Sequence, residues 1–315
     1  MYRESIKVLD CTIRDGGLVN RHKFDHEFVR RSYEGSSKAG VDYFEIGYIN
    51  SSNLFSPSEF GPWKFCSQED IRRVTDGVEN GAKISVMADV GRVEMDHVPP
   101  ADKSAYDMVR VASYVKGVDK AIALANQFHD MGYETCINLM ALSRDQGPEL
   151  DEAFDQVERE SKAIAVYLVD SFGSLYQEDI DNLVKRARKY IKKELGFHGH
   201  NNQQLAFSNT IQAIIQGVNY LDASVYGMGR AAGNCTLELL LGFLKNPKFD
   251  IRPVLDLIAA DYIPLRAKHE WGYIIPHMIV GQLNLHPQEA IDVRKGDQAE
   301  NYRAFYEKMV SAGLD

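Results

Sequence analysis

Two histidines separated by a single glycine are the residues of this sequence best placed to do chemistry together. They are His198 and His200 in the run GFHGHNN, which begins as an apolar strand and ends in amides. Side chains two positions apart on a strand lie on one face, with Cα atoms about 6.6 Å apart. Two imidazoles at that spacing can bind one divalent cation, and Gly199 leaves the opposite face uncrowded. The alternative is a pair of histidines that are only hydrogen-bonded at a polar strand end.

A carboxylate near the start of the chain completes the predicted metal site. Asp15 lies in the run LDCTIRDGG, at the end of the first apolar segment, and Arg14 precedes it. In a closed barrel the first and seventh strands end at the same mouth, so Asp15 is the expected third ligand. Two neutral nitrogens and one carboxylate are compatible with Mn²⁺, Mg²⁺, Co²⁺ or Zn²⁺. With Asp15 in the same rim, we favour the metal site over the hydrogen-bonded pair.

Apolar runs and helical segments alternate along most of the 315 residues. The runs with the composition of buried strands are 8–13, 43–49, 83–89, 108–113, 134–140, 165–171, 196–201 and 220–227. Apolar stripes with helical spacing follow several of them, at 118–125, 180–191 and 207–215. About eight strand–helix units without a break favour a closed (β/α)8 TIM barrel over an open, doubly wound sheet.

The C-terminal part of the chain follows a different pattern. We predict that residues 1–248 form the catalytic barrel and that residues 249–315 form a helical extension packed on it. The extension covers the barrel mouth or forms a homodimer interface, and the sequence favours neither. Active sites of this fold lie where strands end and the following loops begin, so the predicted strand ends locate the site.

The composition narrows the class of partner. The chain has 45 acidic and 36 basic residues, a net charge of −9 and no block rich in lysine or arginine. Binding to nucleic acid or to an anionic membrane is therefore not expected. The N-terminus lacks the pattern of a signal peptide, and no apolar run approaches the roughly 20 residues of a membrane-spanning helix. We expect a cytoplasmic protein that acts on a small molecule.

Several motifs, in order along the chain, resemble the HMGL-like superfamily of pyruvate aldolases and acyl-CoA lyases. LDCTIRDGG is similar to the family's D-x-T-x-R-D-G signature, and GFHGHNN is similar to its H-x-H-N segment. LDAS and GMGRAAGN resemble the D-x-S/T and G-x-G-x-x-x-G-N pieces that follow, and FEIG and VDSFG add weaker matches. The resemblance covers about residues 5–245. The superfamily includes 4-hydroxy-2-oxovalerate aldolase, hydroxymethylglutaryl-CoA lyase and isopropylmalate synthase, and the aldolase subgroup is the most similar.

The resemblance implies a metal-dependent carbon–carbon lyase that acts beside a 2-oxo acid. The simplest such enzyme is an aldolase that releases or consumes pyruvate through a metal-stabilised enolate. It implies that Asp15, His198 and His200 hold the ion, commonly manganese or magnesium, with Asn234 near it. It also implies a catalytic Arg14, which would place a positive charge against the enolate oxygen or the substrate carboxylate.

Three further polar residues are expected to serve this site. Glu45 lies in an apolar strand, where a carboxylate is costly unless paired. Glu45 either orients Arg14 or a metal-bound water, or it transfers a proton itself. The alternative for Arg14 is a purely structural ion pair with Glu45. Ser171 either donates a hydrogen bond to the substrate carboxylate or caps the next helix. Asn138 binds substrate if its side chain points into the barrel.

The base that removes the proton of the substrate hydroxyl is the main departure from the family. The hydroxyoxovalerate aldolases carry a histidine shortly after R-D-G, and the corresponding position here is Leu18. His22 lies four residues further on and is the candidate base, because the pKa of histidine suits this task. A solvated His22 without a role is the alternative. Tyr48, Tyr226 and Tyr273 are other candidates.

Two other functions fit parts of the pattern. A Claisen-type acyltransferase that joins acetyl-CoA to a 2-oxo acid, like isopropylmalate or homocitrate synthase, would explain GMGRAAGN. A barrel that keeps the metal for binding and has lost turnover would explain Leu18. Arg14 and Asp15, both retained, favour an enzyme.

Overall fold

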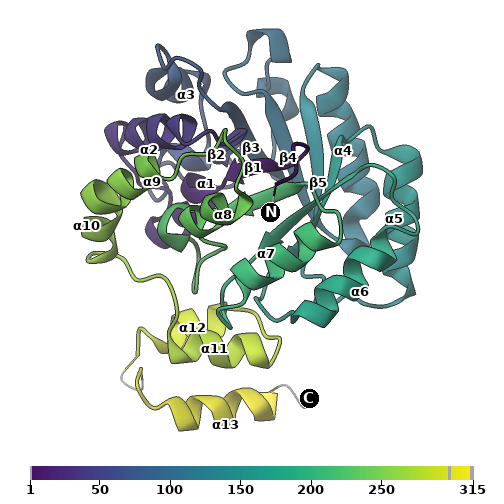
Figure 1. Cartoon of the computed structure of the whole chain (residues 1–315), viewed down its shortest axis with the longest axis vertical. Coiled ribbons are helices and arrows are strands. Elements are labelled where there is room, and N and C mark those ends of the chain that lie inside the picture. Colours follow the sequence, from purple (N-terminus) through teal and green to yellow (C-terminus); the bar gives the residue numbers. More distant parts are fainter. Residues whose placement is uncertain (1, 297–298, 313–315) are drawn as a thin grey trace.

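The computed structural model describes residues 2–296 and 299–312 of the chain. Within these residues eight parallel strands form a closed barrel, in which each strand pairs with the next and the last pairs with the first. They are β1 (Lys7–Asp10), β2 (Tyr43–Tyr48), β3 (Lys83–Asp89), β4 (Met108–Tyr114), β5 (Glu134–Met140), β6 (Ala165–Asp170), β7 (Glu194–Gly199) and β8 (Tyr220–Ala223). The predicted (β/α)8 barrel is confirmed, and Figure 1 shows its helices around the strands.

Within the described residues an α-helix follows every strand except β3, and the helices up to α10 surround the barrel. Those before β8 are α1 (Thr12–Asn20), α2 (His26–Lys38), α3 (Gln68–Thr75), α4 (Val118–Asp130), α5 (Pro148–Glu160), α6 (Gln177–Ala187) and α7 (Ala206–Ile215). Those after it are α8 (Leu237–Leu244), α9 (Arg252–Leu257), α10 (Ile263–Arg266), α11 (Ile275–Gln282), α12 (Gln288–Val293) and α13 (Tyr302–Ala312). In α6 the apolar stripe of Ile180, Leu183 and Val184 is buried, as its helical spacing predicts.

The largest differences from the predicted bounds are at the ends of two strands and one helix, which stop earlier than the sequence suggested. The run 8–13 leaves the strand at Asp10, whose side chain accepts a 2.9 Å hydrogen bond from the backbone N–H of Thr12 and turns the chain into α1. The run 220–227 leaves it at Ala223 and continues as the 3₁₀ helix η5 (Val225–Gly227). The helix expected to reach Ile191 ends at Ala187, although Ile191 is still buried. Burial alone therefore does not distinguish a helix from the turn after it.

The barrel interior is layered. Its lower layer is apolar and consists of Leu9, Tyr43, Met108, Cys136, Ala165 and Tyr167, with close neighbours. Above it, charged side chains enter from alternate strands: Glu45 from β2, Arg110 from β4 and Asp222 from β8, each at most 1% exposed. Alternate strands contribute side chains to one layer in this fold. The charged layer separates the apolar base from the mouth.

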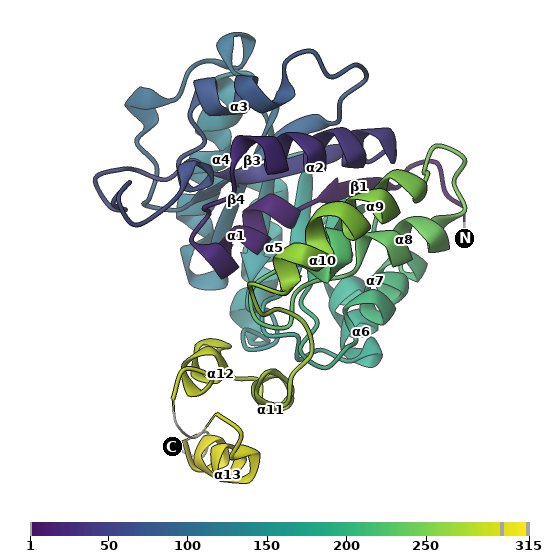
Figure 2. The same ribbon diagram turned by 90° about the vertical axis from the view of Figure 1, so that its left-hand side faces the viewer.

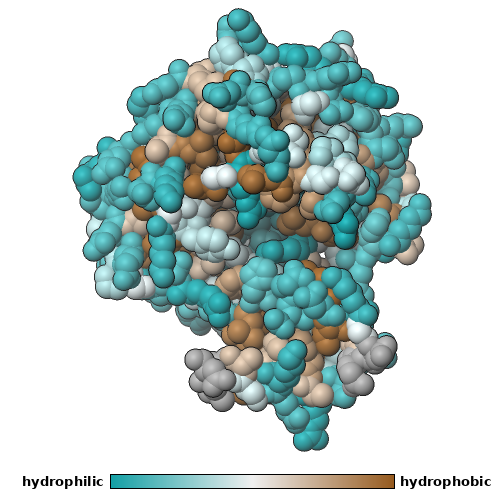
Figure 3. Space-filling model, turned by 180° about the vertical axis from the view of Figure 1, so that it is seen from behind, coloured by the Kyte–Doolittle hydropathy of each residue, from teal (hydrophilic) through white to brown (hydrophobic). Residues whose placement is uncertain are grey.

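The last three helices form a group beyond one end of the barrel (Figures 1 and 2). They have a small apolar core of their own, which includes Ile279, Val280 and Phe305. Hydrogen bonds connect the group to loops at the mouth: Asn284 Nδ2 donates to the Ser143 carbonyl at 3.0 Å. In the space-filling view from behind, apolar surface gathers in the middle of the barrel face and beside the extension (Figure 3). The division at residue 248 stays a prediction.

The sequence predicts that no helix of this chain crosses a membrane, and this can be checked from helix length and composition. None of the helices in residues 2–296 and 299–312 combines the length and the apolar character that crossing a bilayer requires.

Candidate active site

A cavity of about 410 Å³ opens at the carboxyl ends of the strands. Ligand-binding cavities typically have volumes of about 300–1,000 Å³. Its polar lining includes Arg14, Asp15, Tyr48, Lys64, Asp89, Arg92, Asn138, Ser171, His198, His200, Arg230 and His286. The structure therefore brings most of the predicted site residues to one cavity, at the end of the barrel where the sequence placed them.

Asp15, His198 and His200 lie close together in this cavity. One potential ligand atom of each lies within 4.8 Å of the others, and all three residues are buried. The distance from His200 Nε2 to Asp15 Oδ2 is 3.8 Å. Asp15 reaches this position from the first turn of α1 rather than from a strand end, as does Arg14, because the chain turns after Asp10.

The second nitrogen of each histidine is held by another group. His198 Nδ1 lies 2.8 Å from Asp222 Oδ2, and His200 Nδ1 lies 3.0 Å from the Asp170 carbonyl oxygen. The two Nε2 atoms are buried and have no hydrogen-bond partner among the described residues. Metal-binding histidines show this arrangement, in which an outer partner fixes the ring and leaves the other nitrogen for the ion.

The protonation states also suit metal ligands. Burial lowers the pKa of His200 to about 3, so its ring is neutral at pH 7. Burial acts to raise the pKa of Asp15, but the positive charge of Arg14, the neighbouring histidines and the hydrogen bond from Asn234 together outweigh burial and hold that pKa below its ordinary value. The site thus offers two imidazole nitrogens and one carboxylate, a set that a divalent cation can use.

Asn234 and a glycine complete this corner of the cavity. Asn234 Nδ2 donates to Asp15 Oδ2 at 2.8 Å, while Asn234 Oδ1 is buried without a partner. A Cβ atom on Gly229 would lie 2.5 Å from Asp15 Oδ2, so only glycine fits there. The GMGRAAGN turn therefore brings its backbone against the carboxylate.

A second cluster that could hold a metal consists of Cys11, His198 and Asp222. Burial raises the pKa of the Cys11 thiol well above its ordinary value, and a metal-binding cysteine must lose that proton. Asp222 is engaged by Arg110 and His198, much as Asp15 is engaged by Arg14 and Asn234, so the protonated thiol of Cys11 is what distinguishes the two clusters. The cluster around Asp15 therefore fits an ion better.

A chain of buried charges runs across the barrel beneath the cavity. Arg14 Nε donates to Glu45 Oε2 and Arg14 Nη1 donates to Asp15 Oδ1, both at 2.7 Å. Arg110 continues the chain, with Nη1 3.1 Å from Glu45 Oε2 and Nη2 2.7 Å from Asp222 Oδ2. Asp222 then contacts His198. The chain thus connects two candidate metal ligands through four intervening charges.

Arg110 and Asp222 were missed by the sequence predictions. Each is a charged residue inside an apolar strand, MVRVAS or YLDAS, which is the same signal that singled out Glu45. Glu45 contacts both arginines and is fully buried, so it supports Arg14 in position. The predicted Arg14–Glu45 pair is present, and Arg14 also lines the cavity.

Ser171 and Asn138 both line the cavity. Ser171 Oγ accepts a 2.8 Å hydrogen bond from the backbone N–H of Ala141, so it supports the loop after β5 rather than capping the next helix. Its hydroxyl proton remains available to a ligand. Asn138 Oδ1 is buried without a partner among the described residues.

His22 is buried, so the alternative of a solvated ring is wrong. Its side chain is 1% exposed and packs edge-on against Tyr48, with ring centroids 5.4 Å apart. Neither ring nitrogen has a hydrogen-bond partner in the described part of the chain. Burial, helped by the charges of Lys64 and Arg14, lowers the pKa of His22 to about 3. Tyr48, which contacts this ring, lines the cavity together with Leu18, whereas His22 is absent from its lining.

The other two tyrosines lie away from the cavity lining. Tyr226 packs edge-on against Trp271, with ring centroids 6.3 Å apart. Tyr273 is 43% exposed. Of the three tyrosines considered as bases, Tyr48 is the one in contact with the cavity.

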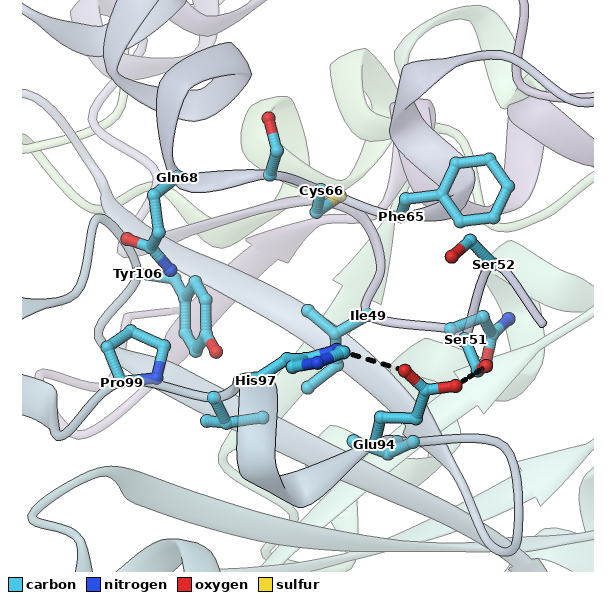
Figure 4. A pocket seen from close by; sticks show the side chains of 14 residues that line it. Ile49, Ser51, Ser52, Phe65, Cys66, Gln68, Glu94, His97, Pro99 and Tyr106 are labelled. Carbon is cyan, nitrogen blue, oxygen red and sulfur yellow. Dashed lines mark hydrogen bonds and ion pairs between the residues drawn. The ribbon is translucent and has the colours of Figure 1, made fainter. Parts of the chain in front are cut away.

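A second cavity, of about 310 Å³, lies beside the mouth (Figure 4). Three of its polar side chains form contacts with one another: Glu94 contacts His97 at 2.9 Å and also accepts a hydrogen bond from Ser51. Apolar side chains such as Ile49 and Phe65 line much of the rest. Asn50 also lines this cavity, and its buried side-chain amide has no hydrogen-bond partner among the described residues. The cluster of Asp15, His198 and His200, however, lines the first cavity.

The chain was compared with known proteins. The family model described as HMGL-like matches residues 5–259. A 4-hydroxy-2-oxovalerate aldolase of Thermus thermophilus is 30% identical over 264 residues, which are 81% of this chain and 74% of the relative. An oxaloacetate decarboxylase of Mycobacterium tuberculosis is 29% identical over 244 residues, which are 78% of this chain and 71% of the relative.

A solved structure agrees with these matches. It is the N-terminal domain of a candidate aldolase from Bacteroides vulgatus, and it is 30% identical with a TM-score of 0.80. The match covers 95% of this chain and 100% of that one. Since the family model spans most of the sequence and the relatives are aldolases and a decarboxylase, the chain belongs to the HMGL-like family and is a carbon–carbon lyase.

Proposed function

We propose that this protein is a divalent-metal-dependent aldolase that breaks or forms the C–C bond next to a 2-oxo acid, with pyruvate released or consumed. The observation that carries the proposal is the pair of free Nε2 atoms of His198 and His200 beside Asp15. The relatives support it, since they are named for 4-hydroxy-2-oxovalerate and oxaloacetate, which are both 2-oxo acids.

Asp15, His198 and His200 would hold the ion, with Asn234 Oδ1 beside it. When bound, a divalent ion supplies Lewis-acid stabilisation for the negative charge that develops on the 2-oxo oxygen. We propose Mn²⁺ or Mg²⁺, and the same ligands are compatible with Co²⁺ or Zn²⁺.

Arg14 would stabilise charge on the substrate. Its Nε and Nη1 are held by Glu45 and Asp15, which fixes the plane of the guanidinium. Nη2 makes no hydrogen bond within the described residues, so it can donate to the 2-oxo oxygen or to the carboxylate of the substrate. Ser171 and Asn138 would position the substrate carboxylate and the groups next to it.

In the cleavage direction the proton and electron movements are simple. The hydroxyl on C4 gives its proton to a base, and the bond between C3 and C4 breaks. The electron pair of this bond forms the enolate of pyruvate, and C4 leaves as an aldehyde. The enolate then takes a proton at C3 to give pyruvate.

We propose His22 as the base, with its ring packed against Tyr48 in the cavity wall. A neutral imidazole has a lone pair available, and the low pKa keeps the ring neutral at pH 7. The same low pKa makes it a weak base, so proton transfer would depend on the position of the ring. Substituting His22→Asn and Tyr48→Phe separately would show which side chain carries the proton, because the responsible variant would lose turnover while still binding pyruvate.

The reaction class can be tested with two assays on the Mn²⁺-loaded protein. In the first assay the protein is incubated with a panel of 4-hydroxy-2-oxo acids, and pyruvate release is measured. In the second it is incubated with acetyl-CoA and 2-oxo acids, and the release of free thiol is measured. Pyruvate release supports the aldolase. Thiol release would identify the acyltransferase. If a protein that binds metal forms neither product, it is a binding protein without turnover.

A further inference from the structure

Lys64 is a buried cation without a partner anion in the wall of the active-site cavity. It ends the 3₁₀ helix η1 (Pro62–Lys64), between β2 and α3, and is 5% exposed. Its Nζ lies 4.5 Å from the ring centre of Tyr48, 4.4 Å from that of Phe55 and 5.6 Å from that of Phe60. Within the described residues its ammonium group forms neither an ion pair nor a hydrogen bond, yet it lines the cavity.

The neighbouring charges leave Lys64 uncompensated. Asp89 on β3 lines the same cavity, but its carboxylate pairs with Arg92 at 2.9 Å. The Arg92 guanidinium also stacks over Phe55, 5.6 Å from the ring centre. Asp89 and Arg92 neutralise each other, so this wall of the cavity presents one net positive charge at Lys64.

The backbone around Lys64 is fixed, so this placement is built into the fold. The preceding residue, Trp63, is completely buried, and its Nε1 donates to the Phe24 carbonyl at 2.9 Å. The Lys64 carbonyl accepts a hydrogen bond from the backbone of Asn50, and the Lys64 amide donates to Gly61. These contacts hold the start of the lysine side chain against the mouth of the barrel.

A structural role does not account for this lysine. Removing an ammonium group from water is costly unless an anion pairs with it. Cation–π attraction to aromatic rings offsets only part of that desolvation free energy. A methionine would fill the space between Tyr48, Phe55 and Phe60 without any charge to desolvate. Groups that cost stability in a cavity are candidates for ligand binding.

We propose that Lys64 binds a carboxylate at the far end of the substrate, on the part that leaves as the aldehyde. The substrates would then be 4-hydroxy-2-oxo acids with a second acidic end, and the aldehyde product would itself be an acid. This inference rests on the proposed function, which assigns the 2-oxo acid end to Asp15, His198 and Arg14. The Lys64 ammonium group supplies one positive charge, which a carboxylate balances more closely than a doubly charged phosphate does.

The test compares two acceptors of equal length in the addition of pyruvate. Succinic semialdehyde and butanal both have four carbons, and one ends in a carboxylate where the other ends in a methyl group. The full-length, Mn²⁺-loaded protein is assayed as wild type, Lys64→Met, Lys64→Arg and Lys248→Met. Lys248 is a matched control, because its Nζ also lies over a ring, 4.6 Å from the centre of Phe249, but it pairs with Asp42 away from the cavity.

The readout is the ratio of kcat/KM for succinic semialdehyde to that for butanal. We expect Lys64→Met to lower this ratio roughly 10- to 100-fold, the effect of losing a hydrogen bond to a charged group. Lys64→Arg should keep most of the preference, and Lys248→Met all of it. An equal ratio in wild type and Lys64→Met would overturn the proposal.

A binding measurement separates this proposal from the proposed function. If pyruvate adds to neither aldehyde, calorimetric titration with butanoate decides the question for Lys64. Weaker binding by Lys64→Met than by wild type would retain the carboxylate site and reject the aldolase, while equal binding would reject the site. Thermal unfolding checks the fold, and Lys64→Met should melt no lower than wild type because it removes a buried charge. If it melts lower, Lys64→Gln is used for the same comparison.

Discussion

The two ends of the barrel differ in whether their charged and polar side chains have partners. At the amino ends of the strands, charges pair with one another near solvent: Asp42 contacts Lys7 at 3.2 Å and Lys248 at 2.8 Å. At the carboxyl ends, buried polar atoms stand without partners among the described residues. They include His198 Nε2, His200 Nε2, Asn138 Oδ1, Asn234 Oδ1 and both ring nitrogens of His22.

This difference separates stability from function. Partly exposed ion pairs contribute little to folding, and they satisfy the charges they contain. A buried polar atom without a partner costs stability, so its retention needs another explanation. At the mouth we propose that a ligand supplies the missing contacts. Four predictions test the difference.

The largest effect is expected from the candidate metal ligands. His198→Ala or His200→Ala should weaken Mn²⁺ binding by more than about 100-fold, because losing a ligand exceeds the effect of losing its outer partner. Isothermal calorimetry measures the affinity. His97→Ala is the control, since the His97 side chain is 79% exposed and pairs with Glu94 beside the other cavity. Full stoichiometric Mn²⁺ binding by both histidine variants would show that the ion does not bind at the cluster of Asp15, His198 and His200.

The buried charges beneath the mouth should be the next most sensitive. Arg110→Met leaves Glu45 and Asp222 with too little positive charge in a fully buried layer. We expect the free energy of unfolding to fall by about 3–5 kcal/mol, as when one partner of a buried ion pair is removed. Urea unfolding measures this. A loss as small as that of an exposed pair would mean that the layer relaxes or admits water.

His22 should make stability depend on pH. Its folded pKa of about 3 lies below the ordinary value of 6.5, so only the unfolded chain takes up its proton as the pH falls through that range. The stability is fully present above pH 6.5 and is lost progressively towards pH 3. Between about pH 6.5 and pH 5 the loss from one such group is about 1.5 kcal/mol.

His22→Asn should remove this part of the pH dependence. Asparagine tolerates the left-handed backbone at this position, where φ is 60°. Urea unfolding of the metal-free protein at both pH values gives the comparison. His200 and His277, whose pKa values are also lowered by burial, contribute equally in both proteins, so the difference isolates His22. An unchanged pH dependence would show that water reaches the ring.

The smallest effect is expected at the base of the barrel. Lys248→Met removes one of two lysines from Asp42, and we expect a loss of less than about 1 kcal/mol. Mn²⁺ affinity should not change. A large loss in unfolding free energy would remove the distinction between the two ends.

The sequence predicted the elements and one half of the site well. The strands were found because buried parallel strands are continuous apolar runs, and the H-x-H spacing needs no tertiary information to place His198 and His200 together. Asp15 was assigned to the same mouth from strand order, although its place on α1 was missed. That turn depends on a hydrogen bond between Asp10 and Thr12, which the apolar pattern does not show.

The rest could not be predicted because it depends on neighbours that are distant in sequence. Arg110 and Asp222 are 112 residues apart and meet only because β4 and β8 face each other across a closed barrel. His22 reads as part of a polar loop, and its burial comes from packing against Tyr48. For Lys64, the sequence cannot show that Phe55 and Phe60 surround it while every nearby carboxylate pairs elsewhere.

The sequence by itself determined the barrel, the family resemblance and the histidine pair, since each depends on local spacing or on the order of motifs. The tertiary structure decided which nitrogen of each histidine is free, which charges support Arg14 and that Lys64 lacks an ion pair among the described residues. These are properties of distances between side chains from different strands. Spacing along one chain does not contain them, because closing the barrel is what brings those strands together.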